Sequence, residues 1–259
     1  MATPTGQPGR NYADRDLKLL WGLSAARCNE PTCRRSLVAT ATPSDRAAVL
    51  GKVAHIYPHS DHPSAPRQNA LFGRENLNKY ENLLLLCGVH HDAVDTQPGA
   101  FPVPKLLKWK QDHEAWVAGK LTDAVANLQF PELEMVVAAW LAGPIAPTEN
   151  FTVTAPVEKM RKNGLTAGVH NHMVIATAGA HEVELFLRHM ITLNQTYPEK
   201  LRAGFLAKYQ TELADGVHGD DLFHSLWSFS CGNSSDFSRR AAGLAVLGYL
   251  FITCEVFEP

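Results

Sequence analysis

The chain has 259 residues, 45% of them hydrophobic, and a formal net charge of −2 at pH 7. This length and composition predict a globular protein of one or two domains, each able to bury a core. Residues 1–10 are polar and rich in Pro and Gly, unlike the apolar core of a signal peptide. The longest apolar run, Ala241–Cys254, is shorter than the about 20 residues of a membrane span. We therefore expect a cytoplasmic chain that makes no membrane contact.

The small net charge hides an asymmetry along the sequence. Residues 1–120 carry 15 Lys and Arg against 11 Asp and Glu, whereas residues 121–259 carry 9 against 15. The first part is therefore net +4 and the remainder net −6. A mildly basic half joined to an acidic half predicts a DNA-handling module next to a module that handles something else.

The first half predicts short strands and helices around a long loop. Asp14–Arg27 has apolar residues at helical spacing and acidic residues near its start, so we expect a helix that leads into Cys28. Tyr57–Asn78 is polar and lacks periodicity, which predicts a loop of a length that is often functional. The other elements expected here are an irregular segment or short strand over Arg34–Asp45, strands over Val49–Ile56 and Leu83–Leu86, a helix from His90, and an amphipathic helix over Pro104–Leu121.

The second half predicts mainly helices. Pro131–Leu141 has Pro at its first turn, as helices often do, and Ala241–Cys254 predicts a buried helix. The remaining expected helices lie at about 180–194, 198–214, 219–230 and 236–252, and short strands are expected over Phe151–Thr154 and His172–Thr177.

Three of the five cysteines have the spacing of metal ligands. Cys28 and Cys33 form a Cys-x4-Cys pair, and Cys87 is followed after two residues by His90. Soft thiolates with one imidazole suit a tetrahedral Zn²⁺ site. We therefore predict a structural zinc bound by these four residues, in a reducing compartment.

His55, Asn82 and His91 follow one another around this Cys/His knuckle, each at the end of an apolar run. The arrangement resembles the HNH endonucleases. The resemblance implies an α+β chain, in which residues 1–122 form a zinc-stabilised ββα-metal HNH domain and residues 125–259 a mostly helical C-terminal domain. It also implies metal-dependent hydrolysis of double-stranded DNA.

The resemblance assigns a role to each residue of the series. His55 occupies the position of the general base, a task that suits an imidazole, whose ordinary pKa is about 6.5. His91 occupies the position of a ligand to the catalytic ion, Mg²⁺ or Mn²⁺. Asn82 matches the asparagine that braces the loop holding the base. Asp95 lies four residues after His91, so the two side chains share one helix face.

One position departs from the family pattern. Many HNH enzymes have Asp or His just before the base as a second metal ligand, and here that residue is Ala54. Asp95, His59 or Asp61 could take its place, and we favour Asp95. A single histidine such as His55 would more often be an ordinary, partly buried side chain, but the joint pattern of ligands and spacing favours the HNH assignment.

Three cations near the expected active site are candidate phosphate contacts. Arg67 and Arg74 lie on the long loop, and Lys79 lies beside Tyr80. The alternative is that they are solvated loop charges.

The C-terminal half is similar to the C-terminal domain of ABC-three-component systems over Lys200–Tyr209, Gly219–Phe223 and Ala241–Phe257. This resemblance implies the nuclease effector of a bacterial anti-phage system, with an ABC-type ATPase and a small middle component as partners. The alternative is a plain helical dimerisation or scaffold domain, and hence a homo-oligomer. Six histidines in this half show no ligand spacing beyond His170-x-His172.

Two functions from different classes follow from the sequence. The first is a metal-dependent DNA endonuclease controlled through its C-terminal domain. The second is a non-catalytic, zinc-containing adaptor that binds DNA or a partner complex. The joint presence of His55, Asn82 and His91 favours the endonuclease.

Overall fold

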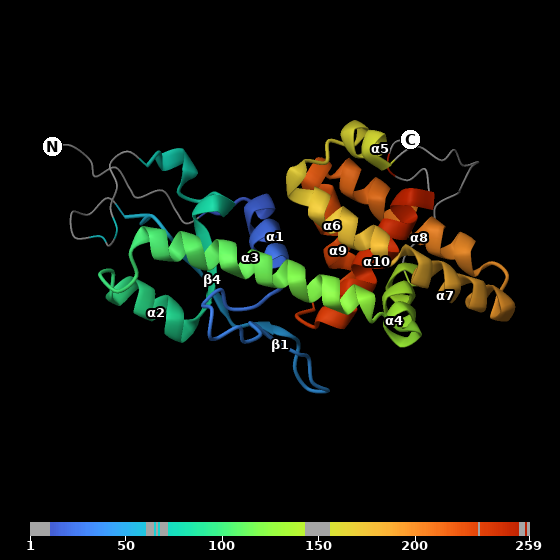
Figure 1. The fold of residues 1–259 in the computed structure, drawn as a ribbon, viewed down its shortest axis with the longest axis horizontal. Coiled ribbons are helices and arrows are strands. Elements are labelled where there is room, and N and C mark those ends of the chain that lie inside the picture. The colour runs from blue at the N-terminus through green and yellow to red at the C-terminus, as the bar shows by residue number, and fades with distance from the viewer. Residues whose placement is uncertain are drawn as a thin grey trace. The chain divides into compact units, whose positions relative to one another are not determined.

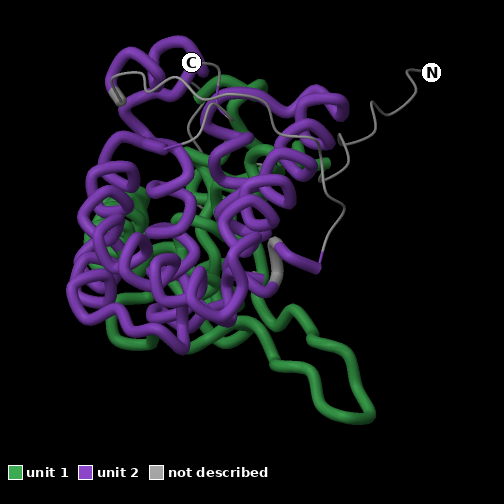
Figure 2. The backbone as a smooth tube through the Cα atoms, turned by 90° about the vertical axis from the view of Figure 1, so that its right-hand side faces the viewer, with its two compact units in different colours: residues 1–117 green, residues 118–259 purple. Residues whose placement is uncertain are grey.

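The structure is a computed structural model that describes residues 11–60, 65, 67, 72–142, 156–232, 234–253 and 257. The chain divides into two compact units, residues 1–117 and residues 118–259 (Figure 2). Helix α3 (Val103–Ala126) crosses this boundary, so its first part belongs to unit 1 and its last part to unit 2. Each unit is described separately below.

Unit 1 combines two small sheets with helices and short 3-10 turns (Figure 1). Besides the start of α3, its elements are α1 (Asp14–Leu23), β1 (Val38–Ala39), β2 (Ala48–Val49), β3 (Gly51–His55), the 3-10 turns η1 (Arg74–Asn76) and η2 (Tyr80–Asn82), β4 (Leu83–Cys87) and α2 (Gly88–Thr96). β4 runs directly into α2, which gives the two-strands-and-helix order that the sequence predicted.

The antiparallel pair of β3 and β4 organises unit 1. Its register pairs Gly51 with Cys87 at one end and His55 with Leu83 at the other. All five residues of β4 are buried, which explains why this strand is an unbroken apolar run. The pairing places His55 beside the turn that carries Asn82, and it places Cys87 at the opposite end of the pair.

Several predicted boundaries in unit 1 need correction. The helix expected over Asp14–Arg27 ends at Leu23, because Ala25 and Ala26 adopt the left-handed region with φ of 49° and 51°. The strand expected over Val49–Ile56 is two strands, β2 paired with β1 and β3 paired with β4. The motif helix begins at Gly88 with Cys87 as its N-cap, so His90 lies in the first turn.

Unit 2 is helical throughout its described residues (Figure 1). Besides the end of α3, it contains α4 (Phe130–Leu141), α5 (Pro156–Lys162), α6 (Ala167–Ala178), α7 (Ala180–Leu193), α8 (Tyr197–Ala214), α9 (Gly219–Cys231) and α10 (Phe237–Thr253). The predicted helices of this half are confirmed to within two residues where the structure describes them. Among all described residues, no helix is both long and apolar enough to cross a bilayer.

The apolar helix α10 forms the core of unit 2, packing against α4, α6, α7 and α9. Its small residues permit close helix contacts. A Cβ on Gly248 would lie only 2.6 Å from the Cβ of Ala176 on α6, so the two backbones meet without an intervening side chain. The prediction of a buried helix over Ala241–Cys254 is therefore confirmed as far as Thr253.

One predicted strand is wrong and another lies outside the described residues. His172–Thr177 is part of α6, although several of its residues are β-branched. The buried positions Val169, Met173 and Ala176 recur at helical spacing, and the Thr166 side chain caps the helix by accepting from Gly168 N. Tertiary packing therefore outweighs β propensity here. The strand expected over Phe151–Thr154 falls on residues that the structure does not describe.

Candidate metal and catalytic site

The predicted zinc ligands converge at the end of the β3–β4 pair away from His55. The ligand atoms of Cys28, Cys33, Cys87 and His90 all lie within 4.8 Å of one another. His90 Nδ1 lies 3.3 Å from Cys87 Sγ and 3.6 Å from Cys28 Sγ. A tetrahedral zinc with ordinary Zn–S and Zn–N bonds would place its ligand atoms about 3.5–3.8 Å apart. The donor set and its spacing therefore fit a structural zinc ion.

The surroundings shift the pKa values of the Cys28 and Cys33 thiols in opposite directions. Burial raises the pKa of the Cys28 thiol to about 12, against the lowering effect of a hydrogen bond from the Cys87 backbone. Burial also acts to raise the pKa of Cys33, but hydrogen bonds from Arg35 outweigh it and the pKa is lowered. Binding of a metal to Cys28 must therefore displace a proton held tightly by a desolvated thiol.

His55, at the end of β3, is held with a defined tautomer. Its Nε2 lies 3.0 Å from Asn78 Oδ1, and Asn78 Nδ2 donates to the Asn11 carbonyl oxygen at 3.2 Å, which fixes the orientation of the amide. His55 Nε2 is therefore the protonated nitrogen and the lone pair resides on Nδ1. The ring is 8% exposed and stacks on Tyr12, with ring centroids 5.7 Å apart. The partner of this base is thus a side-chain amide, that of Asn78.

Asn82 forms three side-chain hydrogen bonds that hold the start of the loop. Its Oδ1 accepts from Tyr57 N at 2.8 Å, and its Nδ2 donates to the carbonyl oxygens of Tyr57 at 3.0 Å and Leu77 at 2.8 Å. Its backbone carbonyl also accepts from Ile56 N. Asn82 thus fixes the residues immediately after His55, which is the arrangement expected of a brace.

His91 lies in the first turn of α2 with its Nδ1 toward two carboxylates. Asp92 Oδ1 is 3.2 Å away, and Asp95 Oδ2 is 3.8 Å away at the i+4 position. Carboxylates in this position orient the imidazole and leave its Nε2 available as a ligand atom. Asp95 Oδ1 lies 3.5 Å from Arg67 Nη2. The carboxylate of Asp95 therefore stands between Arg67 and His91.

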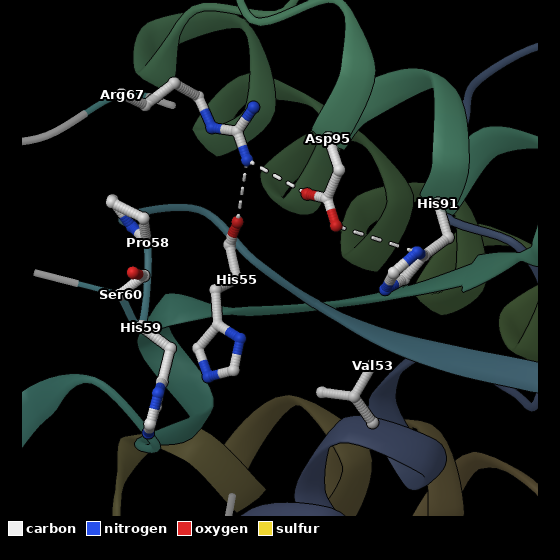
Figure 3. A pocket seen from close by; sticks show the side chains of 8 residues that line it. All are labelled: Val53, His55, Pro58, His59, Ser60, Arg67, His91 and Asp95. Atoms are coloured by element: carbon white, nitrogen blue, oxygen red, sulfur yellow. Dashed lines mark hydrogen bonds and ion pairs between the residues drawn. The ribbon is translucent and has the colours of Figure 1, made fainter. Parts of the chain in front are cut away.

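His55 and His91 line the same pocket, although they come from different elements. This pocket has a volume of about 190 Å³ and is shown in Figure 3. Its lining residues are Val53, His55, Pro58, His59, Ser60, Arg67, His91 and Asp95. The imidazoles of the expected base and the expected metal ligand thus face one space that can accept a phosphate group.

The alternative second metal ligands are placed as follows. Ala54 is buried and absent from the pocket lining, as expected for a side chain that points to the opposite face of the strand from Val53 and His55. His59 lines the pocket with its ring centroid 5.4 Å from that of His55. Asp61 lies outside the described residues.

The three candidate phosphate contacts differ in their surroundings. The Arg67 side chain is only 3% exposed, and its guanidinium donates to protein carbonyls. Its expected contact with phosphate therefore has no support in this geometry. Arg74 on η1 and Lys79 beside η2 are exposed, and Lys79 lies 3.8 Å from Asp16. Neither lines the pocket.

Sequence reasoning missed Asn78 and the structural task of Arg67. Both lie in or beside the loop of Tyr57–Asn78, where polar composition predicts irregular structure but not which groups meet. Asn78 carried no signal of its own. Arg67 was identified from the sequence only as a candidate phosphate contact.

Residues 32–97 match the family model described as HNH endonuclease. The match includes His55, Asn82, Cys87, His90 and His91, and it begins after Cys28. No curated protein matched the chain. Enzymes of this family hydrolyse phosphodiester bonds with the help of divalent metals, so the chain is an endonuclease whose N-terminal part carries the HNH fold.

Proposed function

We propose, from the premise that residues 32–97 form an HNH endonuclease domain, that this chain cleaves double-stranded DNA with His55 as its general base. One observation carries the proposal: His55 on β3 and His91 on α2 line a single pocket of about 190 Å³. A purely structural zinc module does not need two histidines from separate elements around a space of this size.

The residues of the pocket have separate tasks in this proposal. His55 takes a proton from water at Nδ1, because Asn78 occupies its Nε2. Asn82 holds the chain that follows His55 and so keeps the ring in place. Arg74 and Lys79 make phosphate contacts outside the pocket, supported by their exposure.

His91, through Nε2, and Asp95 would hold the divalent ion, Mg²⁺ or Mn²⁺. The carboxylate oxygens of Asp95 suit either ion. When bound, the ion supplies charge that polarises the phosphate and stabilises the departing 3′-oxygen. His91 is suited to this position because Asp92 engages its other nitrogen. Cys28, Cys33, Cys87 and His90 would hold a zinc ion that stabilises the domain without taking part in the reaction.

Nicking of supercoiled plasmid tests the enzymatic proposal. Wild-type protein is expected to convert supercoiled DNA to nicked and linear forms with Mg²⁺ or Mn²⁺ and to stop when EDTA is added. His55→Ala is expected to bind DNA but not cleave it. If wild type and His55→Ala are equally inactive with every divalent ion while both bind DNA, the zinc-containing adaptor is the better description.

We further propose that the chain is the cytoplasmic nuclease effector of a multi-component bacterial anti-phage system. The proposal is supported by the separate helical unit that follows the nuclease, and by the resemblance of residues 125–259 to the C-terminal domain of ABC-three-component systems. The partners would be an ABC-type ATPase and a small middle component, docking on unit 2. The net charge of −6 over residues 121–259 argues against DNA as the ligand of that unit.

Co-purification with the products of neighbouring genes tests this second step. Tagged full-length protein is expected to retain an ATPase subunit, and DNA cleavage by the assembly is expected to respond to ATP. Recovery of homo-oligomers alone, with cleavage unaffected by neighbouring gene products, would favour a self-contained nuclease with a dimerisation domain.

A further inference from the structure

We infer that Arg67 is a positioning residue for phosphodiester hydrolysis: its guanidinium fixes the end of β3 that carries the base against the last turn of α2, the helix that carries the metal ligand. The inference deepens the proposed function and rests on it, since it gives Arg67 a task relative to His55 and His91. In this assignment Arg67 makes no contact with DNA.

The contacts of the guanidinium divide evenly between the two elements (Figure 3). On β3 and its extension, Arg67 Nη2 donates to the His55 carbonyl at 3.3 Å, and Nε donates to the Ile56 carbonyl at 3.0 Å. On α2, Nη1 donates to the Val94 carbonyl at 2.6 Å, and Nη2 lies 3.5 Å from Asp95 Oδ1. One planar group thus joins the two elements that present the pocket's catalytic histidines.

The chemistry of these acceptors explains why a guanidinium is needed. Val94 lies in the last turn of α2, where helix carbonyls have no partner within the helix and attract cations. The side chain of Arg67 is 3% exposed, so its charge requires acceptors in the protein. A fork of five N–H donors can reach two chain segments at once, whereas the single ammonium of lysine cannot.

The backbone of Arg67 gives independent support. Its φ of 59° lies in the left-handed region, which residues other than glycine rarely adopt. Such conformations persist where the surroundings determine them, and they gather at functional sites. The loop therefore adopts an unfavourable backbone conformation at the residue whose side chain joins β3 to α2.

The base is consequently held from two sides. Asn82 fixes Tyr57 through hydrogen bonds at 2.8 Å and 3.0 Å. Arg67 fixes the carbonyls of His55 and Ile56 and links them to α2. Unlike the Asn82 contacts, the Arg67 contacts join the segment that carries the base directly to α2, in addition to the Lys52–Asp92 ion pair at 3.0 Å. Because a displacement of about 1 Å at a reacting group can cost about 100-fold in rate, loss of these contacts should lower kcat rather than DNA affinity.

The decisive variant is Arg67→Lys in the full-length protein, which keeps the positive charge and removes the planar fork. Steady-state cleavage of a labelled DNA duplex with Mn²⁺ is expected to show kcat lowered about 100-fold, with KM changed by less than about twofold. The zinc content and circular dichroism should match wild type. Arg188→Lys is the matched control, because Arg188 lies on the exposed surface of unit 2, where it forms an ion pair with Glu184 at 2.6 Å. It should cleave as wild type does.

A phosphate-contact role predicts the opposite result. Lysine would then preserve most of kcat, KM would rise in Arg67→Ala, and the slope of log affinity against log salt would fall by about one. That outcome overturns the inference. Chemical rescue provides a second readout. Added methylguanidinium should raise the kcat of Arg67→Ala at least about tenfold, whereas ethylammonium at the same concentration should not raise it.

Folding and function are separated by two further comparisons. Cleavage rates are first divided by the folded fraction of each protein at the assay temperature. If the loss of kcat disappears after this correction, the inference is overturned. It is also overturned if neither Arg67→Lys nor Arg67→Ala folds at about 10 °C. Wild type that does not cleave, or His55→Ala that cleaves like wild type, refutes the proposed function together with the inference. Arg67→Lys with wild-type kcat in an otherwise active enzyme refutes the inference alone.

Discussion

Unit 1 arranges its side chains around metal-ligating and hydrogen-bonding groups, whereas unit 2 is organised by one apolar helix. In unit 1 the four predicted zinc ligands lie within 4.8 Å of one another, and Asn82 and Arg67 tie irregular backbone to β3 and α2. In unit 2 the buried face of α10 contacts four other helices. Unit 1 also buries an apolar cluster around β4, but its irregular segments are ordered by polar contacts and by the residues that would ligate zinc. The two units should therefore respond to different perturbations.

The largest effect is expected from loss of zinc. Cys87→Ala should lower the zinc content from about one per chain and unfold unit 1, since structural zinc contributes on the order of 10 kcal/mol to folding. Unit 2 should keep its helices because none of the four ligands lies in it. Metal analysis and circular dichroism measure both results. Cys231→Ala, which removes a buried thiol of α9, is the matched control and should keep its zinc. Folded wild-type protein without zinc would contradict the prediction.

The contrast between the two units also explains how much of the structure could be predicted from the sequence. Cys28, Cys33, Cys87 and His90 were found because ligand chemistry depends on residue type and spacing. Helices α4 and α7 to α10 of unit 2 were predicted from apolar residues at helical spacing. Helix α5 was not predicted, and the strand predicted over His172–Thr177 was wrong because β propensity was given more weight than that spacing.

The contacts of the loop residues could not be predicted from the sequence. Asn78 as the partner of His55, and Arg67 as the link between β3 and α2, depend on how a long polar loop folds back. Composition identifies such a loop but carries no information about which donors and acceptors meet. This is why Arg67 was predicted to contact phosphate, whereas its donors face backbone carbonyls.

The second prediction distinguishes the roles of His55 and His91 while unit 1 stays folded. His55→Ala and His91→Ala should each lower kcat by at least about 100-fold, because one removes a proton acceptor and the other a metal ligand. Raising Mn²⁺ should partly restore His91→Ala and leave His55→Ala inactive. Both variants should retain zinc and the fold. Equal rescue of the two variants by Mn²⁺ would show that these roles are assigned wrongly.

The third prediction concerns acid sensitivity of unit 2, whose core contains two uncharged histidines. Burial, with a smaller effect of Arg240, lowers the pKa of His172 to about 4, and burial with His172 and Arg240 lowers that of His224 to about 3. In the unfolded chain, His172 and His224 take up protons near pH 6.5, whereas in the folded chain they stay neutral. The stability of the fold therefore falls as the pH decreases below about 6.5 and is unaffected above about 7.5. Between pH 7 and pH 5.5, the two histidines should lower the free energy of unfolding by roughly 2–3 kcal/mol.

Urea unfolding of the full chain at several pH values, followed by the fluorescence of Trp227, tests this prediction. Trp227 is suitable because its ring lies 5.1 Å from that of His172. His224→Phe should remove about half of the pH dependence between pH 7 and pH 5.5. The matched control His170→Phe, at an exposed position of α6, should leave the dependence unchanged. A variant His224→Phe with the same pH dependence as wild type would rule out this origin of acid sensitivity.

The smallest effect is expected for two exposed cations of unit 1, and it tests the contrast in charge between the two units. Arg74 and Lys79 are exposed, and phosphate contacts by such side chains release counterions when DNA binds. Replacing both with alanine should weaken duplex binding only several-fold, and should reduce the slope of log affinity against log salt by about one to two.

The matched control for this experiment is the double variant Arg161→Ala with Lys162→Ala, two exposed cations on α5 of unit 2. If DNA binds through unit 1, this control removes the same charge without changing affinity or the salt slope. If the two double variants weaken binding equally, total charge rather than position governs binding. If only the α5 variant weakens binding, unit 2 rather than unit 1 carries the DNA surface, and the assignment of DNA to the unit with the basic excess is wrong.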